Sequence, residues 1–388
     1  MMTRQSRTFL QQGFGLVEIM VGLLIGLIGM LVVMQVYSAS EGQKRSTTSG
    51  SDALSSGLIA LYTPLREARH AGYGISKLNV LGCTVRAYNA NRAPANFTFP
   101  ALAPVIINPA NIPAGDANSD VVMVTYGNSD GIIDGEPFTL KPAAFDEFRV
   151  NNRSGFSIGN LVLAVEPGLD CTIAEVTDLP DSGLCGSSAG AANEVAHNAG
   201  IYTSPASGCA VVPANFNRPG GLGVIYTNGT LYDLGPSPSS VVYAVRNQTL
   251  TVCDFLAQDC TDPGKTADST VWLPAASNII SLQAQYGRDT SPVMDGQVDV
   301  YNKTTPAAGG FGPLSVNCQW ARISAVKLAV LARNTHYDKT VVTTAMPAWS
   351  GGAFDTTGVA DWDHYRYQVY ESVLPLRNMV WMGTQPGC

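Results

Sequence analysis

The chain has 388 residues and a formal net charge of −7, with 14% charged and 45% hydrophobic residues. This length leaves room for one large or two ordinary domains, and the acidic balance argues against a general nucleic-acid-binding surface, which would be basic. The 39 glycines and 23 prolines favour a loop-rich, β-rich globular part over a helical bundle.

An apolar segment near the N-terminus is long enough to cross a membrane. Between Phe14 and Tyr37 the only strongly polar side chains are those of Glu18 and Gln35. A helix of this length spans roughly 36 Å, against about 30 Å for a bilayer core. A carboxylate in such a segment costs roughly 2.5–3.5 kcal/mol at mid-membrane, so Glu18 marks a hypothetical functional site.

The head of this segment resembles the class III signal of type IV prepilins. Arg4 and Arg7 make the first thirteen residues basic. Gly13 would end this leader, Phe14 would begin the mature chain, and Glu18 would be its fifth residue. The resemblance implies that a prepilin peptidase cuts between Gly13 and Phe14, methylates the new amine of Phe14 and leaves the apolar helix on the mature protein.

Cleavage would place a cationic amine about one helical turn from Glu18. Such a pair has few competitors in lipid, so it can set the axial register of one subunit against the next. Glu18 also lies in the first turn, where the helix dipole favours negative charge.

Two other interpretations of this segment are open. An ordinary secretory signal has a basic start and an apolar core of about 7–15 residues, but it lacks an acid and ends in a small-residue cleavage site. A plain membrane anchor would span equally well, but it gives no reason for Gly13-Phe14 or for Glu18.

The helix is predicted to continue to about Ala71, with residues 14–37 in the membrane and 38–72 amphipathic. Ala53, Leu54, Leu58, Leu61 and Leu65 recur at three- and four-residue steps, as on a helix face that packs against a globular part. Glycines at 72 and 74 end the pattern. Small residues that would let another helix approach closely lie on one side of the membrane half, at Gly22, Gly26 and Gly29.

From residue 75 onward, short apolar runs between turn residues predict an antiparallel sheet. The expected strands are Val121–Tyr126, Leu161–Val165, Gly223–Tyr226, Val241–Arg246, Ile279–Tyr286, Ile323–Arg333 and Tyr365–Tyr370. Ile323–Arg333 is apolar on both faces, which predicts a central strand with one face on the long helix and the other under loops. Asn89–Pro113 and Ser182–Ala192 are expected to be loops.

The C-terminal third and the N-terminal 75 residues together resemble the PilW family of type IV pilus minor pilins. The resemblance rests on Arg69-His70-Ala71-Gly72-Tyr73-Gly74, Asn278–Gly287, Asp295–Tyr301, Trp320–Val326, Leu331–Asn334 and Leu376-Arg377-Asn378. It implies an α+β, pilin-like fold, in which the N-terminal helix packs on an antiparallel sheet. The globular domain would be 73–388, with 270–388 as the sheet core and 76–269 as a large, family-variable insertion of loops and strands.

The resemblance also implies function and location. The chain would be stored in the inner membrane by a single span, with its C-terminal domain in the periplasm, and would then enter the pilus tip complex that primes assembly, adhesion and twitching motility. Implied partners are prepilin peptidase, other minor pilins, the major pilin, the inner-membrane assembly platform and a large tip-associated adhesin, with no specific nucleic acid. No enzymatic activity and no cofactor are expected.

Two alternative functions are open. One is a minor pseudopilin of type II secretion, a class similar to this family. The other is a tip-exposed module whose residues 76–269 bind surfaces or DNA.

Eight cysteines in an exported domain predict disulfides formed in an oxidising compartment, although eight allow 105 pairings. Spacing suggests two local loops, Cys253–Cys260 and Cys171–Cys185. Pairing Cys318 with Cys388 would hold the end of the chain, and Cys83 with Cys209 would then remain. A metal site is the alternative, but no Cys-x-x-Cys occurs.

Two further patterns are candidates for chemistry. Oxygen ligands spaced among glycines could wrap Ca²⁺, at Asn128, Asp130, Asp134 and Glu136, although turn formation explains the same residues. Gly186-Ser187-Ser188-Ala189-Gly190 matches the nucleophile elbow of hydrolases, which needs a strand before it and a helix after it. A flexible loop is the simpler interpretation of Ser188.

Overall fold

A computed structural model describes residues 13, 15–131, 134–139, 147–307 and 315–388, with the backbone alone for residues 45–49. The chain divides into two compact units, Met1–Asp52 and Ala53–Cys388. The first unit contains the N-terminal part of helix α1 (Leu16–Ala68), and the second contains its C-terminal part and the strands that the structure describes.

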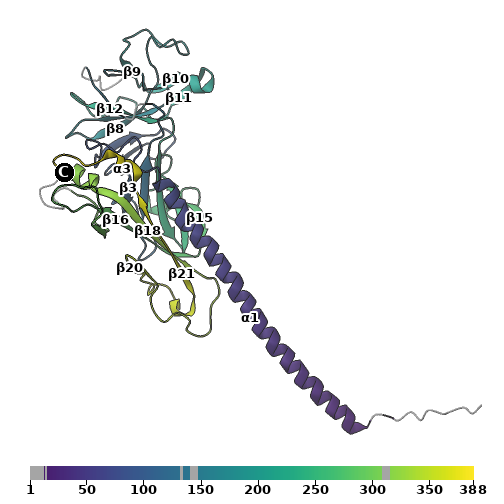
Figure 1. Ribbon diagram of the computed structural model, residues 1–388. Helices are drawn as coiled ribbons and strands as arrows, with labels where there is room; N and C mark the ends of the chain where they lie inside the picture. Colours follow the sequence, from purple (N-terminus) through teal and green to yellow (C-terminus); the bar gives the residue numbers. More distant parts are fainter. Residues whose placement is uncertain (1–12, 14, 132–133, 140–146, 308–314) are drawn as a thin grey trace, which may run out of the picture. The chain divides into compact units, whose positions relative to one another are not determined.

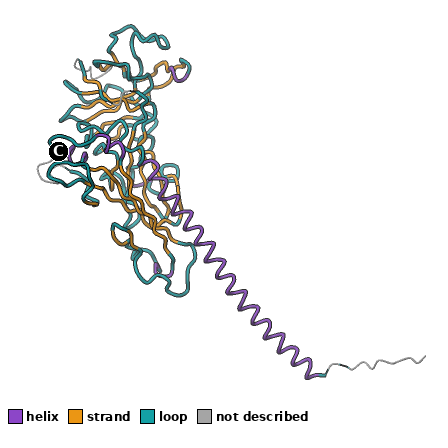
Figure 2. The backbone as a smooth tube through the Cα atoms, viewed as in Figure 1, coloured by secondary structure: helices purple, strands orange, loops and turns teal. Residues whose placement is uncertain are grey.

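Helix α1 begins two residues later than Phe14, which lies outside the described residues, and ends three residues before Ala71. Turns follow it, and Gly72 and Gly74 there have φ of +84° and +75°. Such left-handed backbone favours glycine because other residues place Cβ against the chain. The two glycines therefore end the helix as predicted. Figure 2 shows this helix in purple, with loops and turns in teal.

The insertion sheet has six strands in the order β2-β1-β8-β7-β12-β5. Its strands are β1 (Val85–Tyr88), β2 (Asn96–Phe99), β5 (Glu136–Pro137), β7 (Leu161–Val165), β8 (Cys171–Glu175) and β12 (Thr230–Gly235). Strands β1 and β8 pair in parallel, whereas β1 with β2 and β7 with β8 are antiparallel.

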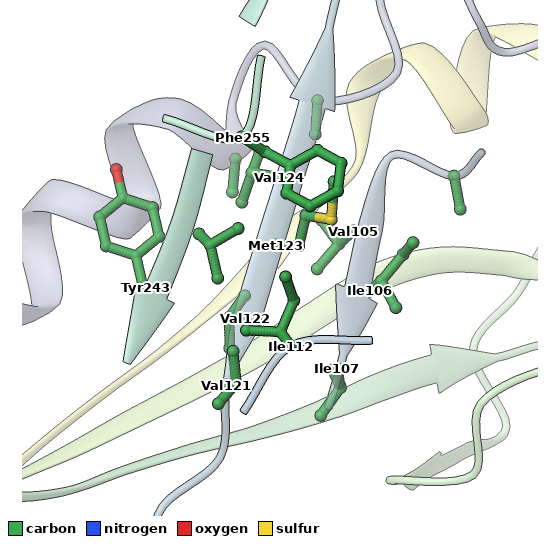
Figure 3. Packing of buried hydrophobic residues seen from close by; sticks show 14 of the residues in the cluster. Val105, Ile106, Ile107, Ile112, Val121, Val122, Met123, Val124, Tyr243 and Phe255 are labelled. Atoms are coloured by element: carbon green, nitrogen blue, oxygen red, sulfur yellow. The ribbon is translucent and has the colours of Figure 1, made fainter. Parts of the chain in front are cut away.

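The middle sheet has five strands in the order β15-β14-β13-β4-β3. Its strands are β3 (Val105–Ile107), β4 (Val122–Tyr126), β13 (Ser239–Arg246), β14 (Thr249–Asp254) and β15 (Leu273–Ser277). Apolar side chains of β3, β4 and β13 meet in the main core with Phe255 and Ile112, which follow strands in loops (Figure 3).

The C-terminal sheet has the order β17-β16-β18-β21. Its strands are β16 (Ile279–Arg288), β17 (Val300–Asn302), β18 (Ile323–Arg333) and β21 (Tyr367–Pro375). The prediction for β18 is confirmed. It lies between two partners, with Leu328 and Val330 in the main core that also holds Ala60 and Leu61 of α1. Its other face packs under Trp349 and Phe354.

Short elements complete the fold (Figure 1). They are β6 (Glu147–Arg149) paired with β9 (Glu194–Ala196), β10 (Gly200–Ser204) with β11 (Ala210–Ala214), β19 (Ala348–Trp349) with β20 (Gly352–Ala353), the helices α2 (Val316–Ala321) and α3 (Arg377–Met382), and the 3-10 turns η1 (Pro205–Ser207), η2 (Pro263–Lys265) and η3 (Trp362–His364).

Three local predictions are wrong. Gly223–Tyr226 is a loop, because Gly223 has a left-handed φ of +73°. Tyr226 is buried there, and its hydroxyl oxygen lies 2.9 Å from both Asp170 O and Thr172 Oγ1. Asn89–Pro113 contains the short strands β2 and β3, which pair with the neighbouring strands β1 and β4. The last strand starts at Tyr367, two residues later than expected.

The disulfides confirm two expected pairs and correct two. Cys253–Cys260 and Cys318–Cys388 are bonded. Cys83 bonds Cys171, not Cys209, because the parallel pairing of β1 with β8 brings their Cα atoms to 6.1 Å. Cys185 therefore bonds Cys209, which joins an outer loop to the β10–β11 turn. Spacing could not predict the Cys83–Cys171 bond, because these cysteines are 88 residues apart in the sequence.

A second cluster, the insertion core, lies on the other face of the insertion sheet. It includes Val162, Ala174 and Leu231 from the sheet, with Phe148 and Val195 from β6 and β9. The ring of His197 lies against that of Phe148, tilted by 38°, with 4.3 Å between their centroids. Only 3% of His197 is exposed. Burial lowers the pKa of His197 from 6.5 to about 4, because the charged imidazolium would lose its hydration.

Acidification should therefore destabilise the fold through His197. Its folded pKa lies below its unfolded value, so the unfolded chain binds a proton more readily and stability falls as pH drops from 6.5 to 4. The loss approaches about 3 kcal/mol below pH 4. In thermal unfolding of the full chain in detergent at pH 7 and pH 4.5, His197→Phe should lose less stability than the wild type. His336→Phe, at a partly exposed site, should behave as the wild type. Equal pH dependence of wild type and His197→Phe would contradict the assignment.

Candidate functional site

The head of α1 carries the predicted assembly residue in its first turn. The backbone amide of Gly15 donates to Glu18 Oε2 at 2.9 Å, and Gly15 O accepts from the amide of Glu18 at 3.0 Å. The carboxylate thus caps one of the amides that a helix start leaves unpaired, where the helix dipole also favours it. Gly13 is exposed and non-helical, and the other half of the predicted cleavage bond, Phe14, lies outside the described residues.

The segment behind Glu18 is not buried by the residues that the structure describes. Leu16–Lys44 is long and apolar enough to cross a membrane by length and composition. Leu24, Leu31 and Val36, for example, are each more than half exposed. Side chains of this kind require an apolar environment that the described chain does not supply.

The three predicted packing glycines face open space. Gly22, Gly26 and Gly29 recur at four- and three-residue steps, so they lie on one side of α1. A Cβ added at any of them would meet no atom within 4 Å. The helix backbone is therefore accessible there to a second helix.

In the second unit, α1 presents two apolar faces. Ala53, Gly57, Ala60, Leu61 and Leu65 are buried. The backbone approaches β21 so closely that a Cβ at Gly57 would lie 2.1 Å from the ring of Tyr370.

The opposite face is an exposed apolar stripe of Leu54, Leu58, Ile59 and Tyr62, each 48–55% exposed. Leu54 and Leu58 were expected to face the globular part. They face outward because the smaller residues Ala53, Gly57 and Ala60 allow the closer contact on the other side.

The end of α1 is held by the C-terminal helix. Asn378 Nδ2 donates to His70 O at 3.1 Å and to Ala71 O at 2.9 Å. The amide of Gly72 donates to Thr125 O of β4 at 2.9 Å. Two motifs that only resemblance had grouped, 69–74 and 376–378, are thus in direct contact. Sequence reasoning assigned no role to Asn378, and no local pattern could have linked it to residues 307 positions away.

A buried charge pair anchors the last residues. Arg322, between α2 and β18, donates to Asp289 Oδ1 at 3.3 Å and to the main-chain oxygen of Cys388 at 2.8 Å. Both partners of the pair are almost fully buried, and Asp289 also accepts from the amides of Asp295 and Gly296. A buried pair needs such added hydrogen bonds to offset its desolvation. Together with the Cys318–Cys388 bond, this pair holds the C-terminus against the C-terminal sheet.

The predicted calcium ligands do not gather. Asp134 pairs with Lys77, the Asn128 side chain accepts from the amide of Ser237 at 2.9 Å, and Glu136 lies in β5. Among the residues described, no three His, Cys, Asp or Glu side chains come together as metal ligands. Calcium there stays a prediction that the geometry does not support.

The candidate nucleophile lies in a loop. Ser188 Oγ donates to Asp178 Oδ2 at 2.6 Å, and neither a preceding strand nor a following helix flanks it among the described residues. The nucleophile elbow depends on that strand–turn–helix context, so residues 186–190 match the motif in sequence but not in structure.

Removing the clamp at the end of α1 should destabilise the protein. Asn378→Ala is expected to cost about 1 kcal/mol, the usual net value of such hydrogen bonds, and Asn378→Asp more, because its carboxylate would face two carbonyls at a helix C-terminus. Thermal unfolding of the full chain measures both variants. Arg377→Ala, on the same helix, should leave the melting temperature nearly unchanged. An Asp variant as stable as the wild type would show that the clamp is not needed.

Comparison with known proteins places this architecture. Residues 242–378, from β13 to Asn378, match the family model of PilW, the type IV pilus-assembly protein W. No curated protein and no solved structure matches the chain. The match contains β16, β18 and β21, whose Tyr370 lies against Gly57 of α1, and it ends at the clamp residue Asn378. The chain thus carries a PilW-family region, which links it to type IV pilus assembly and, in general, to other pilus components.

Proposed function

We propose that this chain is a non-enzymatic minor pilin that is cut between Gly13 and Phe14, N-methylated at Phe14, and built into the tip complex that primes type IV pilus assembly. The observation that carries the proposal is the exposed apolar helix Leu16–Lys44 with Glu18 in its first turn, joined to a globular unit with a PilW-family region. In this role the chain acts as a structural subunit, which is stored in the membrane and then docks and aligns with other pilins, and it requires no cofactor.

The two ends of α1 support this role in different ways. Glu18 now accepts from the Gly15 amide, a neutral donor. A cationic amine at Phe14, in the same or a neighbouring subunit, is a stronger partner for a carboxylate in lipid. Replacing the Gly15 amide by the Phe14 amine as the donor to Glu18 would stabilise one axial position of a subunit relative to all others.

The exposed stripe gives assembly a second contact. Leu54, Leu58, Ile59 and Tyr62 extend the apolar character of α1 beyond the stretch that suffices for a membrane span. Inside a bundle of pilin helices both stretches would be buried, which gains roughly 25 cal/mol per Å² of apolar surface. The implied partners are the major pilin and other minor pilins. Prepilin peptidase and the inner-membrane platform would act before them, and a large tip-associated adhesin after them.

We infer a location to match: a single inner-membrane span with a periplasmic domain, followed by the pilus tip, where the protein would support adhesion and twitching motility. The family description favours the pilus over a type II secretion pseudopilin. Deletion of the gene should abolish pili and leave secretion intact. Lost secretion with normal pili would reverse that choice.

Gly13→Ala should block processing, because the peptidase must accommodate the residue before the cut without a side chain. Mass spectrometry of the membrane-purified protein should then find the first thirteen residues still attached, whereas the wild type begins at a methylated Phe14. Gly15→Ala is the matched control, since a Cβ there meets only the Glu18 carboxylate at 3.7 Å. A wild-type protein that keeps its leader would refute the proposal.

Glu18→Ala should allow cleavage but impair assembly, because the mature amine would lose its partner. Pili counted by electron microscopy should fall severalfold, and Glu18→Gln should fall nearly as far, since it keeps the shape and loses the charge. Glu41→Ala removes a carboxylate farther along the same helix and should pilate normally. Normal piliation in Glu18→Ala would refute the register mechanism while leaving membership of the pilus intact.

A further inference from the structure

The insertion sheet carries a groove that is lined by both polar and apolar side chains. The groove has a volume of about 450 Å³, within the range of small-ligand sites. Its floor is the face of β1, β2 and β8 that continues from the insertion core, and one wall is the loop that contains Arg218 and Leu222.

Strand register fixes the order of the groove's side chains. Arg86 on β1 lies opposite Thr98 on β2 and Thr172 on β8, so two hydroxyls flank one guanidinium. In the next row, Tyr88 lies opposite Asn96. The alternate residues of β1 and β2 are buried in the main core, so this polar set is held by a rigid sheet.

The groove is locally cationic on an acidic protein. Arg86 is half exposed and pairs with Asp170 at 2.7 Å. Arg218 is exposed, and its side chain has no hydrogen bond or ion pair to any part of the chain that the structure describes. Two guanidiniums and one carboxylate leave a net positive charge, whereas the whole chain carries −7.

We propose that this groove binds an acidic sugar, a uronic or sialic acid residue of a glycan. The planar guanidinium of Arg218 matches a carboxylate in bidentate geometry. The Thr98 hydroxyl and the Asn96 amide offer both donors and acceptors, as neighbouring sugar hydroxyls require. Tyr88 and Leu222 supply apolar surface for a ring face. An extended polyanion would meet too few cations here, because its affinity comes from many phosphate contacts.

The site gives the tip-exposed part of the proposed minor pilin a ligand. Its existence does not depend on that role, because binding is measured on the purified chain. Failure of the sugar experiment would therefore leave the pilus proposal untouched, and a piliation defect would not affect the groove.

The test is an isothermal titration calorimetry experiment on the detergent-solubilised full chain. The chain is titrated separately with D-glucuronic acid, N-acetylneuraminic acid, D-glucose and inorganic phosphate. At least one acidic sugar should bind, and glucose should bind at least tenfold more weakly. Arg218→Gln should weaken the acidic sugar about tenfold or more, as should a rise in salt. Arg69→Gln, at another exposed arginine, should change nothing.

A second variant separates a sugar site from a simple anion site. Thr98→Val keeps the branched shape that suits a strand but removes the hydroxyl. It should weaken the acidic sugar several-fold and leave any phosphate binding unchanged. Unchanged thermal unfolding of each variant confirms its fold. The proposal is overturned if no acidic sugar binds, if phosphate binds as tightly as the sugars, or if Arg218→Gln binds the sugars as the wild type does.

Discussion

The close packing of the second part of α1 against its own sheets is the interaction on which the rest of the structure depends. Gly57 and Ala60 bring the helix backbone onto β21 and the main core, at a distance that a larger residue would prevent. Asn378 and Thr125 then bind the carbonyls and the amide at its end. A helix held in this way can leave its other side apolar and uncovered, because its stability no longer depends on burying that side.

The C-terminal sheet and the insertion sheet are stabilised in different ways. In the C-terminal sheet, β18 is buried on both faces, and Arg322, Asp289 and the Cys318–Cys388 bond fix the last residues. The insertion sheet has its own core on one face, next to an open groove over β1, β2 and β8. The family match begins at residue 242, inside the stretch first taken as insertion, so most of β13 and all of β14 belong to the matched region.

The buried polar groups of this fold offset the free-energy cost of their desolvation in two different ways. Arg322 and Asp289 are paired and surrounded by further hydrogen bonds, so their charges are compensated. His197 lies against the ring of Phe148, and its Nε2 has no partner among the described residues, so it is held neutral. The neutral His197 makes the insertion core sensitive to acid, because this imidazole must gain a proton at low pH.

The sequence alone determined the features that depend on neighbours along the chain. These are the apolar helix with Glu18 at its head, the doubly buried strand β18 and the short-loop bond Cys253–Cys260, because hydropathy, period and spacing act over a few residues. Tertiary structure decided the features that depend on strand pairing. The parallel contact of β1 with β8 joined Cys83 to Cys171 and set Arg86 between Thr98 and Thr172. It is also packing in space, and not periodicity, that turned Leu54 and Leu58 outward, since the smallest residues allow the closest approach.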